Sequence, residues 1–483
     1  MQEVISIAAS QSSGHLVTHL YNVQESYIPY SRDAKLTHKN DVYLDPSKVN
    51  GKVNYYPRSL NIELSGGYGY LSKYAFQQAE ADLSAFQNVK IEQKPRVRKN
   101  EYQERLDEGK ATDASMLDLE NTQYWTDYNR LIYKPSSLLT IDDYKSPEGF
   151  HKHFERLKFD TFNIGSAEYK QYEDQVDDAF RKLLESSDNI QGINIFSELD
   201  NAWGGFSSEM LIQLRDEYFN NGVSSKYNIW CYAISSPELP KSQTLTRIRS
   251  FIELSKSSSL LFPLGLDASS SLLTDSFRNN SKWHREAVHA FFVNSIWSLC
   301  NRMKDGVSMA EMESHLLRGF DKRNIVNEIK IHENPQKKAL DIIDDPRIIE
   351  AILRGEPMPS QKPGELSLSL MPSASTAKPF FNQYILSADE EKELCGKKYV
   401  NSDIQKICHM DSFPNIFTTD NLYTEFGQST GLKDYLKDYR KIVQRTRFSK
   451  DIEILGDKGE LIEDISNLVD EYTQGYDSDE ESD

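Results

Sequence analysis

The sequence predicts an α/β fold with a mainly parallel β-sheet covered by helices, followed by a second α+β domain. Three stretches carry this prediction. Residues 190–218, IQGINIFSELDNAWGGFSSEMLIQLRDEY, place an apolar run, a turn and an amphipathic segment in that order. Residues 2–27 repeat the order, and residues 283–303 are apolar over most of a long helix. Strands that alternate with helices favour a parallel sheet with both faces covered.

Length, charge and cysteine content exclude several classes of protein. A chain of 483 residues suggests about two to four domains. The net charge of -18 argues against nucleic acid as the main partner, because binding it needs a concentrated positive surface. It also argues against general adhesion to an anionic membrane. The cysteines lack pairing or metal spacing and indicate reduced thiols: Cys231, Cys300, Cys395 and Cys408.

Targeting signals are not evident in the sequence. No run of about 18 apolar residues occurs, so we expect no transmembrane helix. The N-terminus does not resemble a secretory signal. Glu3 comes early and the first arginine is Arg32, which argues against a mitochondrial presequence. We therefore expect a cytosolic protein, or one that reaches a membrane from the cytosolic side.

The order of residues 190–218 predicts the geometry of an anion site. Residues 190–196 suit a buried strand, residues 197–205 a turn, and residues 207–218 a helix capped by Ser207 or Ser208. A helix N-terminus after such a turn can present backbone N–H groups to an anion. Many strand-to-helix connections have this order without a ligand, so the pattern alone leaves both interpretations open.

The N-terminal unit offers a second candidate position for a ligand. Residues 2–9 predict a strand, residues 10–14 a turn, and residues 15–27 a helix. Ligands of parallel sheets lie at the carboxyl ends of the strands. Gln11 and Ser12 are expected at that edge.

Two further stretches each allow both a functional and a structural interpretation. Residues 55–70 predict a strand in which Leu60, Ile62 and Leu64 alternate with polar residues, and a cluster of glycines then ends it. This cluster is better explained by a plain loop than by close approach to a ligand. Residues 89–120 are strongly charged and poor in apolar residues, which favours a solvated, disordered insertion over a nucleic-acid site.

The remaining elements follow from local patterns. His284 and His289 lie five apart on the apolar helix and so on different faces, which favours structural roles over a metal pair. Ser308 and Glu311 fit a capping box. The other predicted elements are helices at 173–185, 245–254 and 432–446, strands at 227–235, 260–264 and 413–417, and a Pro/Ser-rich loop at 355–380.

The last residues, 470–483, are mostly acidic and predict a disordered tail. Ser478 precedes three acidic residues, so it is a candidate for an acid-directed kinase. An intact mass that never shows a phosphate would remove this hypothesis.

Several of these stretches resemble the tubulin superfamily in order and spacing. MQEVISIAASQSSG is similar to the first tubulin strand and its loop, YYPRSLNIEL to the tubulin strand with a tyrosine-x-proline-arginine start, and IQGINIF with MLIQLRDEY to the elements around the signature loop. YNIWCYAISSPE and the helix at 283–303 resemble the next strand and the core helix. The resemblance covers about the first 310 residues and implies a Rossmann-type sheet with a core helix.

More closely, the chain resembles fungal members of the Misato family. THLYNVQESY, YYPR, YWTDYNRLIYKPSSL and FSELDNAWGGF carry this resemblance. It implies a cytosolic protein needed for mitochondrial distribution and morphology and for inheritance of mitochondrial DNA. It also implies links to tubulin or microtubule assembly.

The signature loop departs from the tubulin pattern. Tubulin-like GTPases hold the phosphates with a loop of three glycines, Thr, Gly, Ser and Gly, whose N–H groups approach the nucleotide. Residues 200–206 match it but are about one residue short, and the leading glycines are absent. Asp200 is expected to repel phosphate by about 1 kcal/mol or more, and Trp203 and Phe206 to add bulk. GTP binding in the tubulin manner is therefore not expected.

Part of the nucleotide site is nevertheless retained. Gln11 and Ser12 match the first tubulin loop, and Gly204 and Gly205 are what is left of the signature loop, so these four residues form a degenerate nucleotide site. The resemblance implies GTP as the one cofactor to consider for this site. In tubulin filaments an acidic loop of the next subunit completes catalysis, and the matching segment holds Glu311, which its capping role already explains.

We thus predict a non-catalytic tubulin-like protein with three parts: residues 1–305, residues 306–469 and the tail 470–483. Its expected partners are tubulin, a chaperonin or outer-mitochondrial proteins, and its expected location is the cytoplasm, in association with mitochondria. A tubulin or chaperonin assembly adaptor and an active tubulin-like GTPase are the alternatives.

Overall fold

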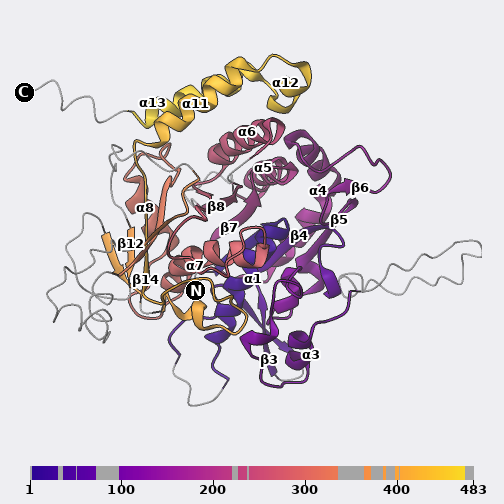
Figure 1. The fold of residues 1–483 in the computed structure, drawn as a ribbon, viewed down its shortest axis with the longest axis vertical. Helices are drawn as coiled ribbons and strands as arrows, with labels where there is room; N and C mark the ends of the chain where they lie inside the picture. Colours follow the sequence, from indigo (N-terminus) through magenta and orange to yellow (C-terminus); the bar gives the residue numbers. More distant parts are fainter. Residues whose placement is uncertain are drawn as a thin grey trace, which may run out of the picture.

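The computed structural model describes residues 3–30, 36–49, 52–71, 97–219, 227–236, 239–334, 364–370, 384–387, 397–401 and 403–473. Within them the chain forms a large sheet between two layers of helices, a smaller sheet beside it, and a C-terminal helical hairpin (Figure 1). The α/β fold expected from the sequence is confirmed.

The large sheet has seven strands in the order β6-β5-β4-β1-β7-β8-β9, and every pairing except β5 with β6 is parallel. Strands β1 and β8 are buried along their whole length, as expected when helices cover both faces. The strands are β1 (Glu3–Ala9), β4 (Ser59–Ser65), β5 (Leu138–Lys145), β6 (Phe150–His151), β7 (Ile190–Glu198), β8 (Asn228–Ile234) and β9 (Leu260–Leu264).

Strand β4 is buried on both faces although its sequence alternates between apolar and polar residues. Its apolar and polar residues alternate, which is typical of a strand with one wet face. Asn61 and Glu63 are nevertheless buried, because β4 lies inside the sheet between β1 and β5. The alternation therefore marks a buried polar group and not a solvated face.

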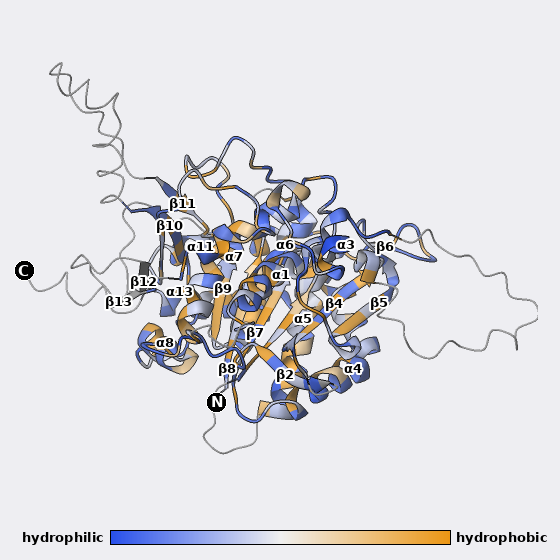
Figure 2. Cartoon of the chain, turned by 90° about the horizontal axis from the view of Figure 1, so that it is seen from below, coloured by the Kyte–Doolittle hydropathy of each residue, from blue (hydrophilic) through white to orange (hydrophobic). Residues whose placement is uncertain are grey.

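Two helical layers enclose the large sheet. Helices α1 (Gln11–Ser26) and α7 (Lys282–Cys300) cover one face, and α4 (Phe162–Glu185), α5 (Ala202–Leu214) and α6 (Lys241–Ser257) cover the other. Figure 2 shows the apolar strands enclosed by helices whose hydrophilic residues lie on the outside. Helix α7 is buried on nearly all sides, which confirms the predicted core helix.

The second sheet lies on the far side of α7. Its order is β11-β10-β14-β12-β13, with only the β12–β13 pair parallel. Phe292 of α7 contacts Phe262 of β9 at 6.1 Å and Phe426 of β14 at 5.5 Å between ring centroids, so α7 joins the two sheets. The strands are β10 (Glu328–Glu333), β11 (Glu365–Ser367), β12 (Tyr384–Ser387), β13 (Lys397–Val400) and β14 (Leu422–Gly427).

The second half of the chain also departs from prediction in two places. Residues 413–417 were predicted as a strand but form irregular chain with buried Phe413 and Ile416, and only Phe417 makes a bridge. Apolar content alone does not distinguish a strand from a packed loop. Within the predicted loop 355–380, residues 365–367 form the edge strand β11, and most of the rest lies outside the described residues.

Part of the charged stretch at 89–120 is ordered. Residues 97–120 are described, and helix α3 (Glu101–Asp107) begins there with Asn100 as its N-cap. Tyr102 is buried with Leu117, Tyr128 and Trp283. A few well-placed aromatic contacts therefore anchor a segment whose composition predicts disorder, while residues 89–96 lie outside the described part of the chain.

The C-terminal helices α11 (Leu432–Arg445), α12 (Ser449–Leu455) and α13 (Lys458–Glu471) pack on α6 of the first sheet. Their apolar residues join the core on that face, so this part of the predicted second region contributes to the core of the first. The amphipathic helix expected at 432–446 is confirmed as α11. Residues 474–483 of the predicted tail are not described.

A small hairpin, β2 (Leu44–Val49) with β3 (Lys52–Pro57), precedes β4. The three cysteines in the described chain are free. None of its helices has the length and apolar character needed to cross a bilayer, and its acidic, histidine and cysteine side chains form no group suited to hold a metal ion.

Candidate functional site

The candidate site lies where the strand order reverses. From β1 the sheet grows through β4, β5 and β6 on one side and through β7, β8 and β9 on the other. Helix α1 leaves the carboxyl end of β1, and helix α5 leaves the carboxyl end of the neighbouring β7. Two helix N-termini therefore meet at the edge where open α/β sheets bind ligands.

Helix α1 begins directly after a tight turn at Ser10. Ser10 has φ 129° and ψ 163°, a conformation that residues with a Cβ adopt only under strain. It still caps the helix, because its hydroxyl accepts the Ser13 N–H at 3.1 Å. The turn between strand and helix is thus a single residue, which brings Gln11 and Ser12 directly to the sheet edge.

Gln11 and Ser12 are both held by cations of α7. The ammonium of Lys282 donates to Gln11 Oε1, and Gln11 Nε2 donates to the Gln123 carbonyl at 3.2 Å. Arg285 Nη2 donates to the buried Ser12 hydroxyl at 3.1 Å. The structure therefore brings these two predicted residues together with two basic side chains, of which Arg285 lies within the core helix predicted at 283–303 and Lys282 directly precedes it.

Lys282 and Arg285 carried a signal in the sequence. Both lie in the first turn of α7, where a positive charge opposes the helix dipole. Cations at that position are better explained by a polar partner across the site than by helix stability. The partner is α1, more than 250 residues earlier, and no local pattern points to it.

Two buried acids lie beside these cations, and near neutral pH only Glu286 offsets their positive charge. Glu286 contacts Arg285 and His289 at 2.8 Å each. Burial alone would raise the pKa of Glu286, but Arg285 and His289 outweigh burial and lower it to about 2. Burial raises the pKa of Glu63 to about 8, although Lys282 and the Trp125 indole act in the opposite direction.

His289 and His284, for which structural roles are predicted, form hydrogen bonds with neighbouring segments of the chain. His289 bridges Glu286 and the Gly265 carbonyl, and His284 Nδ1 accepts the Arg278 N–H at 3.1 Å.

Gly204 and Gly205 lie inside α5 and not in the turn predicted for them. The helix begins at Ala202 with Asn201 as its N-cap, so Ser207 and Ser208 are interior residues and not caps. A Cβ on Gly204 would lie 2.1 Å from Ser250 Oγ of α6, and one on Gly205 would lie 2.0 Å from the Phe162 carbonyl oxygen of α4. Both glycines are thus explained by close helix packing.

Asp200 corrects a second expectation. Its carboxylate accepts from Arg247 Nε at 2.7 Å and Nη2 at 3.0 Å, and from the Ser236 N–H at 2.6 Å. A paired carboxylate of this kind does not act as the free negative charge that the sequence suggested.

Trp203 and Phe206 likewise do not add bulk to the site. Trp203 packs on Phe159, and Phe206 on Tyr169.

Trp125 fills the space beside the first turn of α1. It is fully buried, and its indole donates to Glu63 Oε1 at 3.1 Å. A Cβ on Gly14 would lie 2.5 Å from this indole, so Gly14 is required for the contact. A hollow of about 380 Å³ remains next to it, lined by Gln11, Leu119, Thr122, Gln123, Tyr124, Pro147, Asn280, Ser281 and Lys282.

Glu311 lies at the opposite edge of the sheet. It follows Ser308, whose hydroxyl accepts the Glu311 N–H at 3.1 Å as the N-cap of α8 (Met309–Leu317). Helix α8 begins beside Gly192, at the amino end of β7. Glu311 is therefore far from the site of its own chain.

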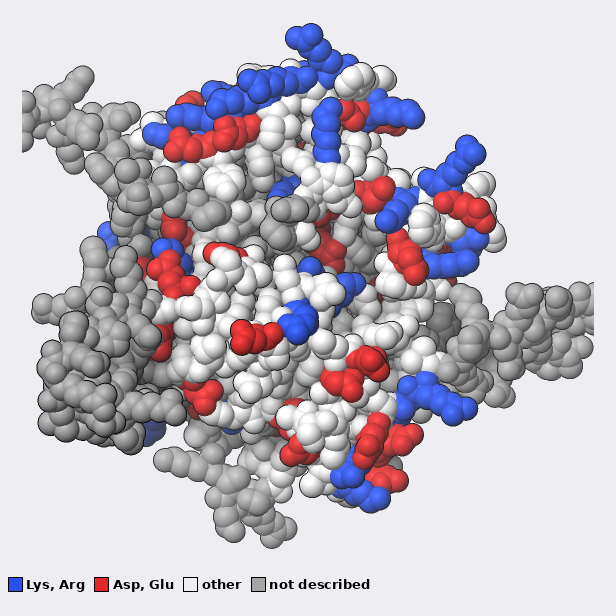
Figure 3. Space-filling model, viewed as in Figure 1, with Lys and Arg blue, Asp and Glu red and all other residues white. Residues whose placement is uncertain are grey.

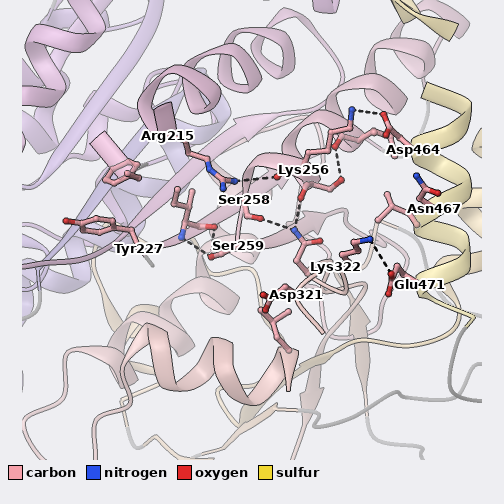
Figure 4. Close-up of a pocket in the computed structure, with 17 residues that line it drawn as sticks. Arg215, Tyr227, Lys256, Ser258, Ser259, Asp321, Lys322, Asp464, Asn467 and Glu471 are labelled. Carbon is pink, nitrogen blue, oxygen red and sulfur yellow. Dashed lines mark hydrogen bonds and ion pairs between the residues drawn. The ribbon is translucent and has the colours of Figure 1, made fainter. Parts of the chain in front are cut away.

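A second cavity, of about 490 Å³, lies between the ends of α6, α8 and α13 (Figure 4). Its cations are engaged within the wall. Lys256 pairs with Asp464 at 2.6 Å, Lys322 with Glu471 at 3.8 Å, and Arg215 donates to the Ser257 carbonyl at 2.7 Å. We assign no ligand to this cavity.

Comparison with known proteins agrees with this architecture. A family described as a tubulin domain matches residues 114–303, so the fold and the position of the site define a tubulin-like protein. A Misato Segment II tubulin-like domain matches residues 2–108.

The full-length relatives agree. Protein DML1 of Debaryomyces hansenii is 44% identical over 100% of both chains, and that of Candida albicans 34% over 100% of both. That of Scheffersomyces stipitis is 35% identical over 100% of this chain and 99% of its own. The chain belongs to the Misato family of tubulin-like proteins.

Proposed function

We propose that this chain is a non-catalytic tubulin-like protein that acts in the partitioning of mitochondria and the inheritance of mitochondrial DNA. It works from the cytoplasm, on the cytosolic side of the organelle. Membership of the Misato family supports the role. The state of the would-be phosphate site supports the absence of catalysis.

The observation that carries the proposal is the first turn of α5. Its donors are used internally, because Asn201 accepts the Trp203 N–H at 3.0 Å and the Gly204 N–H at 3.1 Å. Its two glycines contact α4 and α6. Phosphate binding needs free N–H groups and open space at such a turn. Here the Trp203 and Gly204 N–H groups are bonded to Asn201, and the packed helices occupy the space.

The α1 side retains more of an anion site. Gln11, Ser12, Lys282 and Arg285 converge there, and weak binding of a phosphate group is compatible with them. Hydrolysis additionally needs a residue that positions water, which in a tubulin-type filament comes from the next subunit. The matching residue of this chain, Glu311, lies in the first turn of α8, behind its N-cap Ser308. Retained surface and lost chemistry together favour a scaffold over an enzyme.

Calorimetric titration with GTP and Mg²⁺ tests the catalytic part. We expect no saturable heat at micromolar nucleotide and no phosphate release. Stoichiometric binding with turnover would instead establish the active tubulin-like GTPase and reject the proposal.

Rapid depletion of the protein tests the cellular part. Mitochondria, their DNA and microtubules are imaged in the same cells over one division. We expect mitochondrial collapse or loss of their DNA before any change in microtubules. Microtubules that fail first would make the mitochondrial effect secondary.

An assembly adaptor for tubulin or a chaperonin is the second candidate. The preserved tubulin-like fold with an altered phosphate turn favours it, because such a fold keeps surfaces for tubulin-type partners. Stoichiometric co-purification with tubulin or a chaperonin at low salt would support it, and an empty pull-down would count against it.

A further inference from the structure

Helix α11 and the corner that follows it form a basic ridge on an acidic protein. Residues 432–450 contain seven Lys or Arg and two Asp, whereas the whole chain has a net charge of -18. Figure 3 shows a row of Lys and Arg along the edge where α11 and α12 lie in Figure 1. The ridge consists of Lys433, Lys437, Arg440, Lys441, Arg445, Arg447 and Lys450.

The charges of the ridge face outward and are mostly available. Residues spaced four and then three or four apart share one side of a helix, which places Lys433, Lys437, Arg440 and Lys441 on one strip. The opposite side of α11 is buried through Leu436, Tyr439 and Val443. In the described chain, Lys433, Arg445, Arg447 and Lys450 form no ion pair.

An aromatic side chain projects from the corner. The side chain of Phe448 is 72% exposed, lies between Arg447 and Lys450, and is covered on one face only by the Lys241 ammonium at 5.2 Å. A single exposed apolar side chain needs no special explanation, whereas several near one another mark a contact surface, so the surroundings of Phe448 decide its meaning.

A second corner of the same composition lies nearby. Residues 150–158, FHKHFERLK, expose Phe150, Phe154 and Leu157 among three cations. Both corners flank the first turn of α4, because Asn163 Nδ2 donates to the Glu453 carbonyl of α12 at 2.6 Å. Exposed apolar groups and cations therefore occur together twice at this end of the molecule.

We propose that the ridge and the two corners dock the protein on an anionic lipid bilayer. Cations along a convex edge suit a flat negative surface, and exposed aromatic residues between them suit the boundary between headgroups and acyl chains. An acidic peptide needs a groove that orders it, whereas this surface is an outer ridge. Charges more than about 10 Å away are screened at physiological salt. Among the nearer acids, Asp434 and Asp438 pair with Lys437 and Lys441 within α11, and Asp464 of the adjacent α13 pairs with Lys256.

Vesicle flotation with the full chain tests the proposal. We expect binding to vesicles of phosphatidylcholine with phosphatidylserine, loss of binding at high salt, and little binding to phosphatidylcholine alone. Arg445→Glu with Arg447→Glu should weaken binding roughly tenfold or more, and Phe448→Ala with Phe154→Ala should weaken it at unchanged net charge.

The matched control is Arg105→Glu with Lys110→Glu. These exposed cations lie in and just after α3, at the opposite end of the molecule (Figure 1), and the pair changes the net charge by the same amount. Circular dichroism melts confirm that each variant is folded. Equal losses in the two charge variants, or equal binding to both kinds of vesicle, would overturn the proposal.

Light scattering without lipid tests whether a second copy of the chain binds the ridge instead of a bilayer. We expect a mass independent of concentration. A dimer that dissociates on Arg445→Glu with Arg447→Glu would assign the ridge to a second copy of the chain and would also overturn the proposal.

Discussion

Single residues of the site are explained by what touches them. Gly204, Gly205 and Gly14 each permit a contact with another element that a Cβ would block. Asp200 and Glu63 are both buried acids, but their charge is accommodated differently. Asp200 is paired to Arg247, whereas Glu63 accepts the Trp125 indole N–H and has a raised pKa. The identity of each residue follows from packing or charge, with no ligand needed to explain it.

Gly205→Ala should destabilise the protein. The new Cβ would collide with the Phe162 carbonyl oxygen of α4, and overpacking of this kind costs about 1–3 kcal/mol. Gly459→Ala in the first turn of α13 is the control, because its Cβ meets only the exposed Asp457 side chain; its effect should be about 0.5 kcal/mol or less. Urea unfolding measures both, and equal effects would contradict the packing role.

Glu63 should make stability fall as pH rises. Its folded pKa of about 8 exceeds the ordinary 4.5, so the folded state holds the extra proton between these values and loses stability as pH rises through them. Glu63→Gln should therefore melt higher than the natural protein near pH 8 and alike near pH 5. Exposed Glu120→Gln is the control, and a parallel pH dependence of all three would contradict the assignment.

At the scale of elements, the site is shaped by a segment outside the strand–helix units. Residues 97–134 bring Trp125 against α1 and beside Glu63, and they provide part of the wall of the remaining hollow. Helix α7 supplies the cations on the other side. The α1 end of the site is thus held from two directions by aromatic and basic groups.

Trp125→Ala should therefore destabilise the domain by about 3–5 kcal/mol, as large-to-small changes of fully buried aromatics do. Trp125→Phe keeps most of the volume but loses the donor to Glu63, and it should cost clearly less. The free energies of unfolding of the two variants, measured with denaturant, separate the effect of lost side-chain volume from the effect of the lost hydrogen bond. A loss as large in the phenylalanine variant would attribute the effect to the hydrogen bond instead.

At the scale of the whole molecule, α7 is shared by both sheets. The apolar cluster around it includes residues of β8, β9, β10 and β14, and the C-terminal hairpin completes the opposite face of the first sheet. Parts distant in sequence thus depend on common contacts. The two sheets are therefore expected to unfold together.

Thermal unfolding should show one transition by circular dichroism and by tryptophan fluorescence. Phe292→Ala in α7 should lower that single midpoint for both probes, because it removes contacts to both sheets. Exposed Phe154→Ala should leave the midpoint nearly unchanged. Two separate midpoints in the natural protein would show that the sheets are independent.

The sequence by itself determined strands β1, β4, β7, β8 and β9 of the large sheet, most of its helices and the core helix, because hydrophobic periodicity and capping are local. It also placed Gln11 and Ser12 at the sheet edge, since strand order and turn length are readable along the chain. Only the tertiary structure decided that α5 begins at Ala202, that its glycines serve packing, and which charges meet. Arg247 lies 47 residues from Asp200, and Lys282 lies 271 from Gln11. No local pattern encodes contacts at such separations, because folding of the whole sheet creates them.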